Sequence, residues 1–174
     1  INLLENFRIY QKNIKFIFSS SDKAYGESRQ LPYKEHFPLN GLNPYDASKA
    51  CSDFIARSYA KSFNIQICVT RFVNIYGPGD VNWQRIIPGT LNSLIKSKKP
   101  ILRSNGKFKR DYLYIDDVID GYMRLGQQMG INKTISGIAF NFGSGKPITV
   151  LNLVKIILKF FDKESSFLVI KNKA

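Results

Sequence analysis

The feature that most constrains this fold is a pair of short apolar runs, each followed by polar residues. Residues 16–18 read Phe-Ile-Phe and residues 67–69 read Ile-Cys-Val. A run without polar alternation is typical of a strand that is covered on both faces. Strands alternating with helices predict a parallel α/β sheet. The strands expected here are 15–21 and 65–72, and the helices expected around them are 2–11 and 44–63.

The second half of the chain predicts shorter elements in the same alternation. Residues 22–43, which are rich in Gly, Pro, Asn and charge, are expected to form a loop. Because the chain opens in a helix without a preceding strand, we expect it to be part of a longer sheet. Further helices are expected at 87–98, 116–129 and 150–161, and further strands at 101–103, 112–115 and 139–142.

The composition argues against several classes of protein. The net charge is +13, but the basic residues are scattered rather than gathered in a stripe with aromatic residues, so we do not expect nucleic-acid binding. No apolar run approaches the roughly 18 residues that a membrane helix needs. Two cysteines and one histidine argue against a disulfide framework and a metal site. Since no signal-peptide pattern is present either, we expect a cytoplasmic protein without membrane contact.

The first candidate for chemistry is the pair Tyr45 and Lys49, which are four residues apart in the helix expected at 44–63. This spacing puts both side chains on one helical face. A phenol is a poor base at neutral pH, and a neighbouring ammonium favours its ionised form. The pair could therefore take a proton from a sugar hydroxyl while hydride leaves the same carbon. The alternative is a surface tyrosine beside a solvated lysine, because this spacing is common by chance.

A second candidate is Ser21, which ends the first expected strand. In open α/β sheets, ligands bind at the carboxyl ends of the strands. Ser21 could therefore hydrogen-bond the reacting hydroxyl. The alternative is that the serines at 19–21 only satisfy backbone groups where the strand ends.

Four motifs in this order resemble the extended short-chain dehydrogenase/reductase family, whose members include NAD-dependent sugar-nucleotide epimerases and dehydratases. The motifs are FIFSSSDKAYG, NPYDASK, RFVNIYGPGD and RDYLYIDDV. The resemblance implies that Tyr45 is the base, that Lys49 also binds the nicotinamide ribose, and that Ser21 orients the substrate. It further implies NAD as the cofactor, with contacts from Ser19, Tyr45, Lys49, Phe72 and Val73.

The same resemblance implies the fold and its domains. It predicts a partial Rossmann-like doubly wound parallel sheet, with its N-terminal half missing, and a small mixed α/β substrate-binding region. Residues 1–80 would form the C-terminal half of the NAD-binding domain, which carries the Tyr45–Lys49 helix, and 81–174 mainly the substrate-binding region, with strands and helices that return to the core. The family's glycine-rich phosphate loop has no counterpart here, so we expect the isolated segment to bind NAD poorly and to be inactive. When full length, the protein is expected to be a homodimer.

The residues after Ser21 bear on the reaction. Ser21, Asp22 and Lys23 resemble the corresponding segment of CDP-glucose 4,6-dehydratases, although RDYLYIDDV is the general form of the family. Asp22 would protonate the departing C6 hydroxyl, which is a poor leaving group. Lys23 would take the C5 proton or assist its removal, and the product would be a 4-keto-6-deoxy sugar. The alternatives are an ordinary loop ion pair, an epimerase on the same scaffold, and an inactive fragment.

The resemblance also implies substrate-binding residues, since the substrate is a nucleotide sugar. Asn74 matches the family's diphosphate asparagine, and Arg110 matches its diphosphate arginine. Arg85 lies where the family often has a basic residue near the substrate. Guanidinium groups bind diphosphate oxygens in pairs. Arg103 is a further candidate, for which an exposed charge at a strand end is an equal alternative.

Overall fold

A computed structural model describes residues 1–10, 13–28 and 30–171, and the chain divides into two compact units. Unit 1 comprises Ile1–Val73 and Asp116–Gly143, and unit 2 comprises Asn74–Ile115 and Ser144–Ala174. Residues 116–143 follow the predicted boundary at residue 80 in the chain and pack in unit 1. The functional assignment of the two regions, to cofactor and to substrate, stays a prediction.

Unit 1 is built on a three-stranded parallel sheet in the order β1-β2-β7. Its strands are β1 (Lys15–Ser21), β2 (Gln66–Phe72) and β7 (Ala139–Phe142). Lys15 pairs with Gln66 and Ser21 with Phe72, so the carboxyl ends of β1 and β2 are level. Residues that end these two strands are therefore brought to one edge of the sheet. The helices of unit 1 are α1 (Asn2–Tyr10), η1 (Asp22–Tyr25), α2 (Pro44–Phe63), α4 (Ile115–Ile131) and η2 (Lys133–Ile135).

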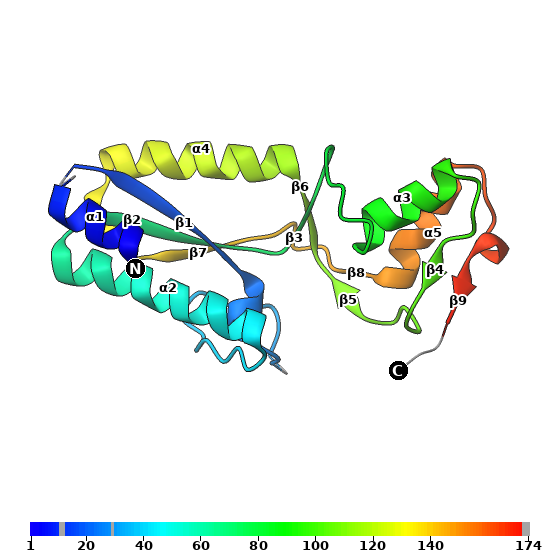
Figure 1. The fold of residues 1–174 in the computed structure, drawn as a ribbon, viewed down its shortest axis with the longest axis horizontal. Coiled ribbons are helices and arrows are strands. Elements are labelled where there is room, and N and C mark those ends of the chain that lie inside the picture. The colour runs from blue at the N-terminus through cyan, green and yellow to red at the C-terminus, as the bar shows by residue number, and fades with distance from the viewer. Residues whose placement is uncertain (11–12, 29, 172–174) are drawn as a thin grey trace. The chain divides into compact units, whose positions relative to one another are not determined.

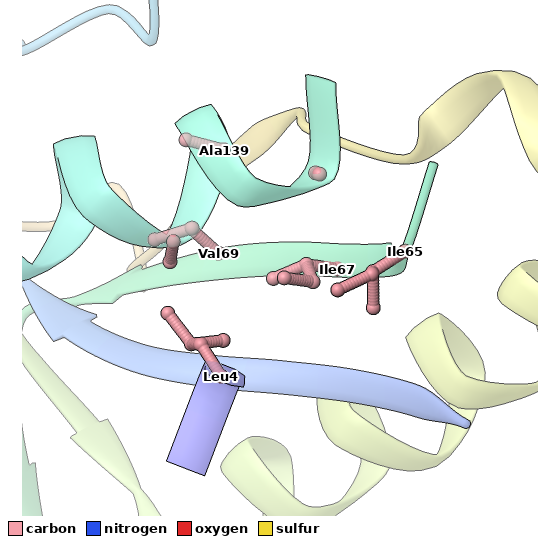
Figure 2. Packing of buried hydrophobic residues seen from close by; sticks show 7 residues of the cluster. Leu4, Ile65, Ile67, Val69 and Ala139 are labelled. Carbon is pink, nitrogen blue, oxygen red and sulfur yellow. The ribbon is translucent and has the colours of Figure 1, made fainter. Parts of the chain in front are cut away.

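Helices cover both faces of this sheet, with α2 on one side and α4 on the other (Figure 1). On the α2 face, Ile67 and Val69 are fully buried together with Ala56 and Ala60. Leu4 of α1 joins the same cluster (Figure 2). Burying an aliphatic side chain of this kind contributes about 1.5–3 kcal/mol.

The α4 face has a second cluster, in which Cys68 packs against Leu125 and Met129. Cys68 lies between Ile67 and Val69 in the chain, so successive residues of β2 enter opposite cores. This arrangement is why the run at 67–69 shows no polar alternation. It confirms the prediction of an α/β fold with a doubly wound, Rossmann-like parallel sheet.

In unit 2 the α-helices α3 (Ile86–Ile95) and α5 (Val150–Phe160) pack against each other. Leu94 of α3 and Val154, Ile157 and Leu158 of α5 share one apolar cluster with Leu102. Short strand pairs complete the unit: β3 (Asn74–Tyr76) with β6 (Tyr112–Tyr114), β4 (Ile101–Leu102) with β9 (Val169–Ile170), and β5 (Lys109–Arg110) with β8 (Ile148–Thr149). A short helix η3 (Ser165–Phe167) precedes β9. Unit 2 is thus the small mixed α/β region that was predicted.

Several predicted boundaries are wrong by a few residues. The helix predicted at 87–98 ends at Ile95, because the chain turns at Ser97 with a left-handed φ of 55°. The strand predicted at 112–115 ends at Tyr114, and Ile115 already begins α4. The loop predicted at 22–43 contains the short helix η1. The last residue of the helix predicted at 2–11, Gln11, lies outside the described residues.

Within residues 1–10, 13–28 and 30–171, no helix combines the length and the apolar character that crossing a bilayer requires. Nor do three or more His, Cys, Asp or Glu side chains gather there in a group that could hold a metal ion.

Candidate active site and substrate cleft

The helix α2 places Tyr45 in its first turn. Asn43 caps the helix, its side-chain oxygen accepting a hydrogen bond from the backbone N–H of Asp46 at 3.0 Å. Pro44 occupies the first helical position, where its missing N–H costs nothing. The Tyr45 side chain is 56% exposed, and the Lys49 ammonium lies 5.9 Å from the centre of its ring. The structure therefore brings these two predicted residues together on an accessible helical face.

The end of β1 places the three other predicted catalytic residues next to one another. The Ser21 hydroxyl donates to the Asp22 carboxylate at 3.0 Å and accepts from the backbone N–H of Lys23 at 3.2 Å. Ser21 thereby caps η1, the short helix that contains Asp22 and Lys23. Ser19, predicted to contact the cofactor, lies in the same strand with its side chain exposed.

Ser20 connects these two groups, although it was not predicted as a site residue. Its side chain is 5% exposed, and its hydroxyl lies 3.5 Å from the backbone carbonyl of Lys49. The contact joins the end of β1 to the turn of α2 that carries Lys49. Because alternate residues of a strand point to opposite faces, Ser20 faces α2 and Ser19 faces the other way. The run of three serines in the sequence conceals this difference.

Phe72 and Val73, the other two predicted cofactor residues, lie where β2 ends. Phe72 is 2% exposed, and its ring packs 4.8 Å from that of Phe142 and 5.1 Å from that of Tyr122. The backbone N–H of Val73 donates to the carbonyl of Phe142 at 3.1 Å. The aromatic cluster holds this strand end in place, and the role of both residues toward a cofactor stays a prediction.

Tyr25, Asp53 and Arg71 form a buried, hydrogen-bonded cluster in unit 1. They were missed as site residues, but two signals were present in the sequence. Asp53 lies four residues beyond Lys49 and so continues the stripe of α2 that carries Tyr45 and Lys49. Arg71 is a charged residue within the buried strand β2, where a charge needs a partner.

In unit 2, Asn74 is engaged by the backbone of the neighbouring strand segment. Its side-chain amide donates to the carbonyl of Asp111 at 3.0 Å. The Asp111 carboxylate accepts hydrogen bonds from the Ser144 hydroxyl and from the backbone N–H of Gly145, the latter at 3.0 Å. Asp111 therefore holds the residue predicted to contact the diphosphate, and it also anchors the loop at 144–146.

Arg110 is exposed on the same strand segment of unit 2. Its guanidinium donates to the carbonyl of Lys109 at 3.0 Å and lies 5.8 Å from the centre of the Phe108 ring. Burial raises the pKa of the neighbouring Tyr112 phenol, and the charge of Arg110 offsets part of this shift. Among the described residues, these contacts of Arg110 are with its own neighbours in the chain, which leaves most of its donors available to a ligand.

Arg85 and Arg103 both line one open cleft of about 900 Å³ in unit 2. Trp83, which is 54% exposed, lies on the same wall as Arg85. Arg85 also forms an exposed ion pair with Asp80 at 3.2 Å. The lining also contains three lysines, which add to its positive charge: Lys98, Lys99 and Lys171. Asn74 and Arg110 are not among the described residues that line this cleft.

The chain resembles known proteins over most of its length. The model of the NAD dependent epimerase/dehydratase family matches residues 1–143. A dTDP-D-glucose 4,6-dehydratase of Dictyostelium discoideum is 35% identical over 167 residues, which cover 90% of this chain and 37% of that protein. The chain spans half the length, or less, of the curated relatives it matches.

Two solved structures show the same fold. The dTDP-glucose 4,6-dehydratase of Bacillus anthracis in complex with NAD superposes with a TM-score of 0.87 and 28% identity, covering 97% of this chain and 52% of that one. The UDP-glucose 4-epimerase of Thermotoga maritima with UDP-glucose gives a TM-score of 0.84 and 26% identity, covering 99% and 54%. Both dehydratases and epimerases are therefore similar to this chain.

Proposed function

Because the chain belongs to the NAD dependent epimerase/dehydratase family, we propose that it carries the catalytic residues of a sugar-nucleotide 4,6-dehydratase. The observation that carries this proposal is the placement of Asp22 and Lys23 directly after Ser21, at the same end of unit 1 as Tyr45 and Lys49. A sugar-nucleotide 4-epimerase is the second candidate, favoured by the similarity to the epimerase of Thermotoga maritima.

The first step would oxidise C4 of the sugar. Tyr45 takes the proton of the C4 hydroxyl, and the Lys49 ammonium beside its ring stabilises the negative charge of the phenolate. Ser21 hydrogen-bonds the same hydroxyl and fixes its orientation. NAD, when bound, supplies a hydride acceptor that is regenerated when the hydride returns to the sugar.

The second step separates a dehydratase from an epimerase. Once C4 is a ketone, the C5 proton is acidic, and Lys23, as the neutral amine, takes it or assists its removal. Asp22, as the protonated acid, gives its proton to the C6 hydroxyl, which leaves as water rather than as hydroxide, and Asp22 is left as the carboxylate. An epimerase breaks no carbon–oxygen bond and has no need of this acid. The Asp22 carboxylate accepts a hydrogen bond from Ser21, which fixes its position at the end of β1.

The predicted cofactor residues of unit 1 suit the nicotinamide and ribose end of NAD. Lys49 lies beside an exposed tyrosine, and Ser19 is exposed on the same strand as Ser21. In the proposed complex Lys49 holds the nicotinamide ribose, and Ser19, Phe72 and Val73 contact the nicotinamide end. Hydroxyl and ammonium donors suit the ribose oxygens of such a cofactor.

The cleft in unit 2 would hold the nucleotide. Arg85 and Arg103 present guanidinium groups to a cleft large enough for a nucleoside, and Trp83 offers a ring on which a base can stack. Asn74 and Arg110 would contact the diphosphate. We further propose that the whole protein acts in the cytoplasm as a homodimer.

The proposal is tested by incubating the full-length protein with NAD and a panel of nucleotide sugars. CDP-glucose belongs in the panel because of Asp22 and Lys23, and dTDP- and UDP-glucose belong in it because of the similar proteins. We expect a 4-keto-6-deoxy product from one of them and no product from a Tyr45→Phe control. A product that is only the C4 epimer would replace the dehydratase by the epimerase, and no conversion of any sugar would refute both.

A further inference from the structure

Arg71 lies at the centre of a buried polar cluster in unit 1. Its side chain is 1% exposed, Asp53 on α2 is fully buried, and Tyr25 at the end of η1 is 2% exposed. Taking a charge out of water costs several kcal/mol unless hydrogen bonds and an opposite charge compensate it. The contacts of Arg71 therefore need to be accounted for one by one.

The guanidinium of Arg71 donates to three separate segments. Its Nε and Nη2 atoms donate to the two carboxylate oxygens of Asp53 at 2.8 and 3.0 Å. Its Nη1 atom donates to the Tyr25 hydroxyl at 2.6 Å and to the backbone carbonyl of Glu35 at 3.0 Å. Burial alone would lower the pKa of Arg71, but the hydrogen bonds to Asp53 and Tyr25 outweigh it and raise this pKa above its usual value. The fork geometry is specific to arginine, because a lysine ammonium cannot reach these acceptors together.

Tyr25 extends the cluster toward the neighbouring strand. Its ring lies 4.8 Å below the guanidinium of Arg71, and its hydroxyl donates to the side-chain oxygen of Asn141 on β7 at 2.7 Å. Gly26, which follows it, has a φ of +70°, and a Cβ there would meet the carbonyl oxygen of Asn40 at 2.3 Å. The end of η1 is therefore held on several sides, and Arg71 is the charged group among its contacts.

These contacts connect the two elements that carry the predicted catalytic residues. Asp53 lies one helical turn beyond Lys49 on α2, and two turns beyond Tyr45. Tyr25 ends the four-residue helix η1 that begins with Asp22 and Lys23. Arg71 thus bonds both the helix of the proposed base and the turn of the proposed acid.

We infer that Arg71 is a positioning residue, which holds the Asp22–Lys23 turn against the helix that carries Tyr45 and Lys49. The catalytic part of this inference rests on the proposed function. The first step uses Tyr45, whereas water loss also needs Asp22 and Lys23 at a fixed place relative to the same sugar. A misplacement of about 1 Å can cost on the order of a hundredfold in rate. Loosening this contact should therefore slow water loss more than the oxidation.

Arg57 offers a matched comparison within the same cluster. Its Nε atom also lies 2.8 Å from an Asp53 carboxylate oxygen, but it comes from α2 itself, and its side chain is 31% exposed. An ion pair that only stabilised α2 could be made in this way. What Arg71 adds is the bond from α2 to η1.

The test uses the full-length protein with the Tyr25→Phe variant, which keeps the ring and removes the hydroxyl that Arg71 bonds. We expect kcat for the deoxy sugar to fall roughly tenfold, KM to stay within about twofold, and the absorbance of reduced nicotinamide to rise during turnover. In the Arg57→Gln control, kcat should stay within about twofold of the wild type. Equal effects of the two variants on kcat and on the nicotinamide absorbance would overturn the inference.

A second measurement does not depend on catalysis. Backbone hydrogen exchange should become at least about threefold faster at residues 22–26 in Tyr25→Phe and in Arg71→Lys, but not in Arg57→Gln. If the wild-type protein makes no deoxy sugar, the proposed function fails, and this exchange still decides whether Arg71 holds the turn. Unchanged exchange at 22–26 in both Tyr25→Phe and Arg71→Lys would refute the positioning role itself.

Discussion

Arg71 and Asp53 of unit 1 are buried and paired, whereas the arginines of the cleft of unit 2 are exposed. Arg71 and Asp53 bond each other with almost no contact with water. In unit 2, the Arg85 side chain is 61% exposed, and Arg103 is exposed on the wall of the cleft. In this pair of unit 1 each charge is satisfied by the other, and the pair fixes the geometry of the elements it joins. In unit 2 the guanidinium groups of Arg85 and Arg103 face solvent, where an anionic ligand can reach them, although Arg85 also pairs with Asp80.

The largest effect on stability is expected from Asp53→Ala. If unit 1 tolerated this change, the contrast between the buried pair of unit 1 and the exposed charges of unit 2 would fail. The variant leaves the buried Arg71 without its counter-charge, so we expect the free energy of unfolding to fall by about 3–5 kcal/mol. Asp120→Ala is the control, because it removes an exposed ion pair with Arg124. Arg124 lies four residues after Asp120, just as Arg57 lies four residues after Asp53. The control should cost less than about 0.5 kcal/mol. Urea unfolding measures both, and similar losses would show that the buried pair has no special role.

A smaller effect, on binding instead of stability, is expected from Arg103→Gln. Losing one guanidinium from the cleft should weaken nucleoside diphosphate binding about tenfold, or about 1.4 kcal/mol, with unfolding unchanged. Titration calorimetry with UDP, dTDP and CDP measures this change. Arg124→Gln, which removes an exposed arginine from unit 1, should leave the affinity unchanged. A loss of stability without a loss of affinity would place Arg103 among the structural residues.

The smallest effect is on the pH dependence of stability, and it comes from the buried Cys68 thiol in the core of unit 1. Burial raises the pKa of the Cys68 thiol from 9.0 to about 11, so the folded state keeps it protonated where the unfolded chain ionises. The stability that the neutral Cys68 thiol contributes is complete below the unfolded-state pKa of 9.0. It is lost as the pH rises toward the folded-state pKa of about 11. At about pH 9.5 we expect the wild type to have lost less than about 1 kcal/mol relative to Cys68→Val, each compared with its own neutral value. A loss near pH 7, or a gain at alkaline pH, would contradict a buried neutral thiol.

The sequence predicted the elements of unit 1 better than those of unit 2, for a physical reason. A strand buried on both faces leaves an unbroken apolar run, as at Ile67 and Val69, and an N-cap followed by proline marks where α2 begins. The pairs β5–β8 and β4–β9 are only two residues long in each strand, too short for any periodicity. Leu102 of β4 packs in the cluster that α3 and α5 share, and a contact between such distant parts of the chain leaves no local pattern.

The site follows the same rule. Tyr45 and Lys49 could be predicted because one helix fixes their spacing, and Ser21 could be predicted because it ends a strand. The contact between Arg71 and Tyr25 joins residues 46 positions apart, so it depends on the register of β1 and β2 and on the path of η1. The contact between Arg71 and Tyr25 therefore could not be predicted from the sequence alone.

The most direct test of this account is a time course of reduced nicotinamide in the full-length Asp22→Asn variant with its nucleotide sugar. If Asp22 supplies the proton for water loss, the variant oxidises the sugar but stalls there. Reduced cofactor should then accumulate to a large fraction of the enzyme, while the deoxy product forms at least about a hundredfold more slowly than in the wild type. A wild-type rate of product formation, without accumulated reduced cofactor, would contradict the dehydratase assignment.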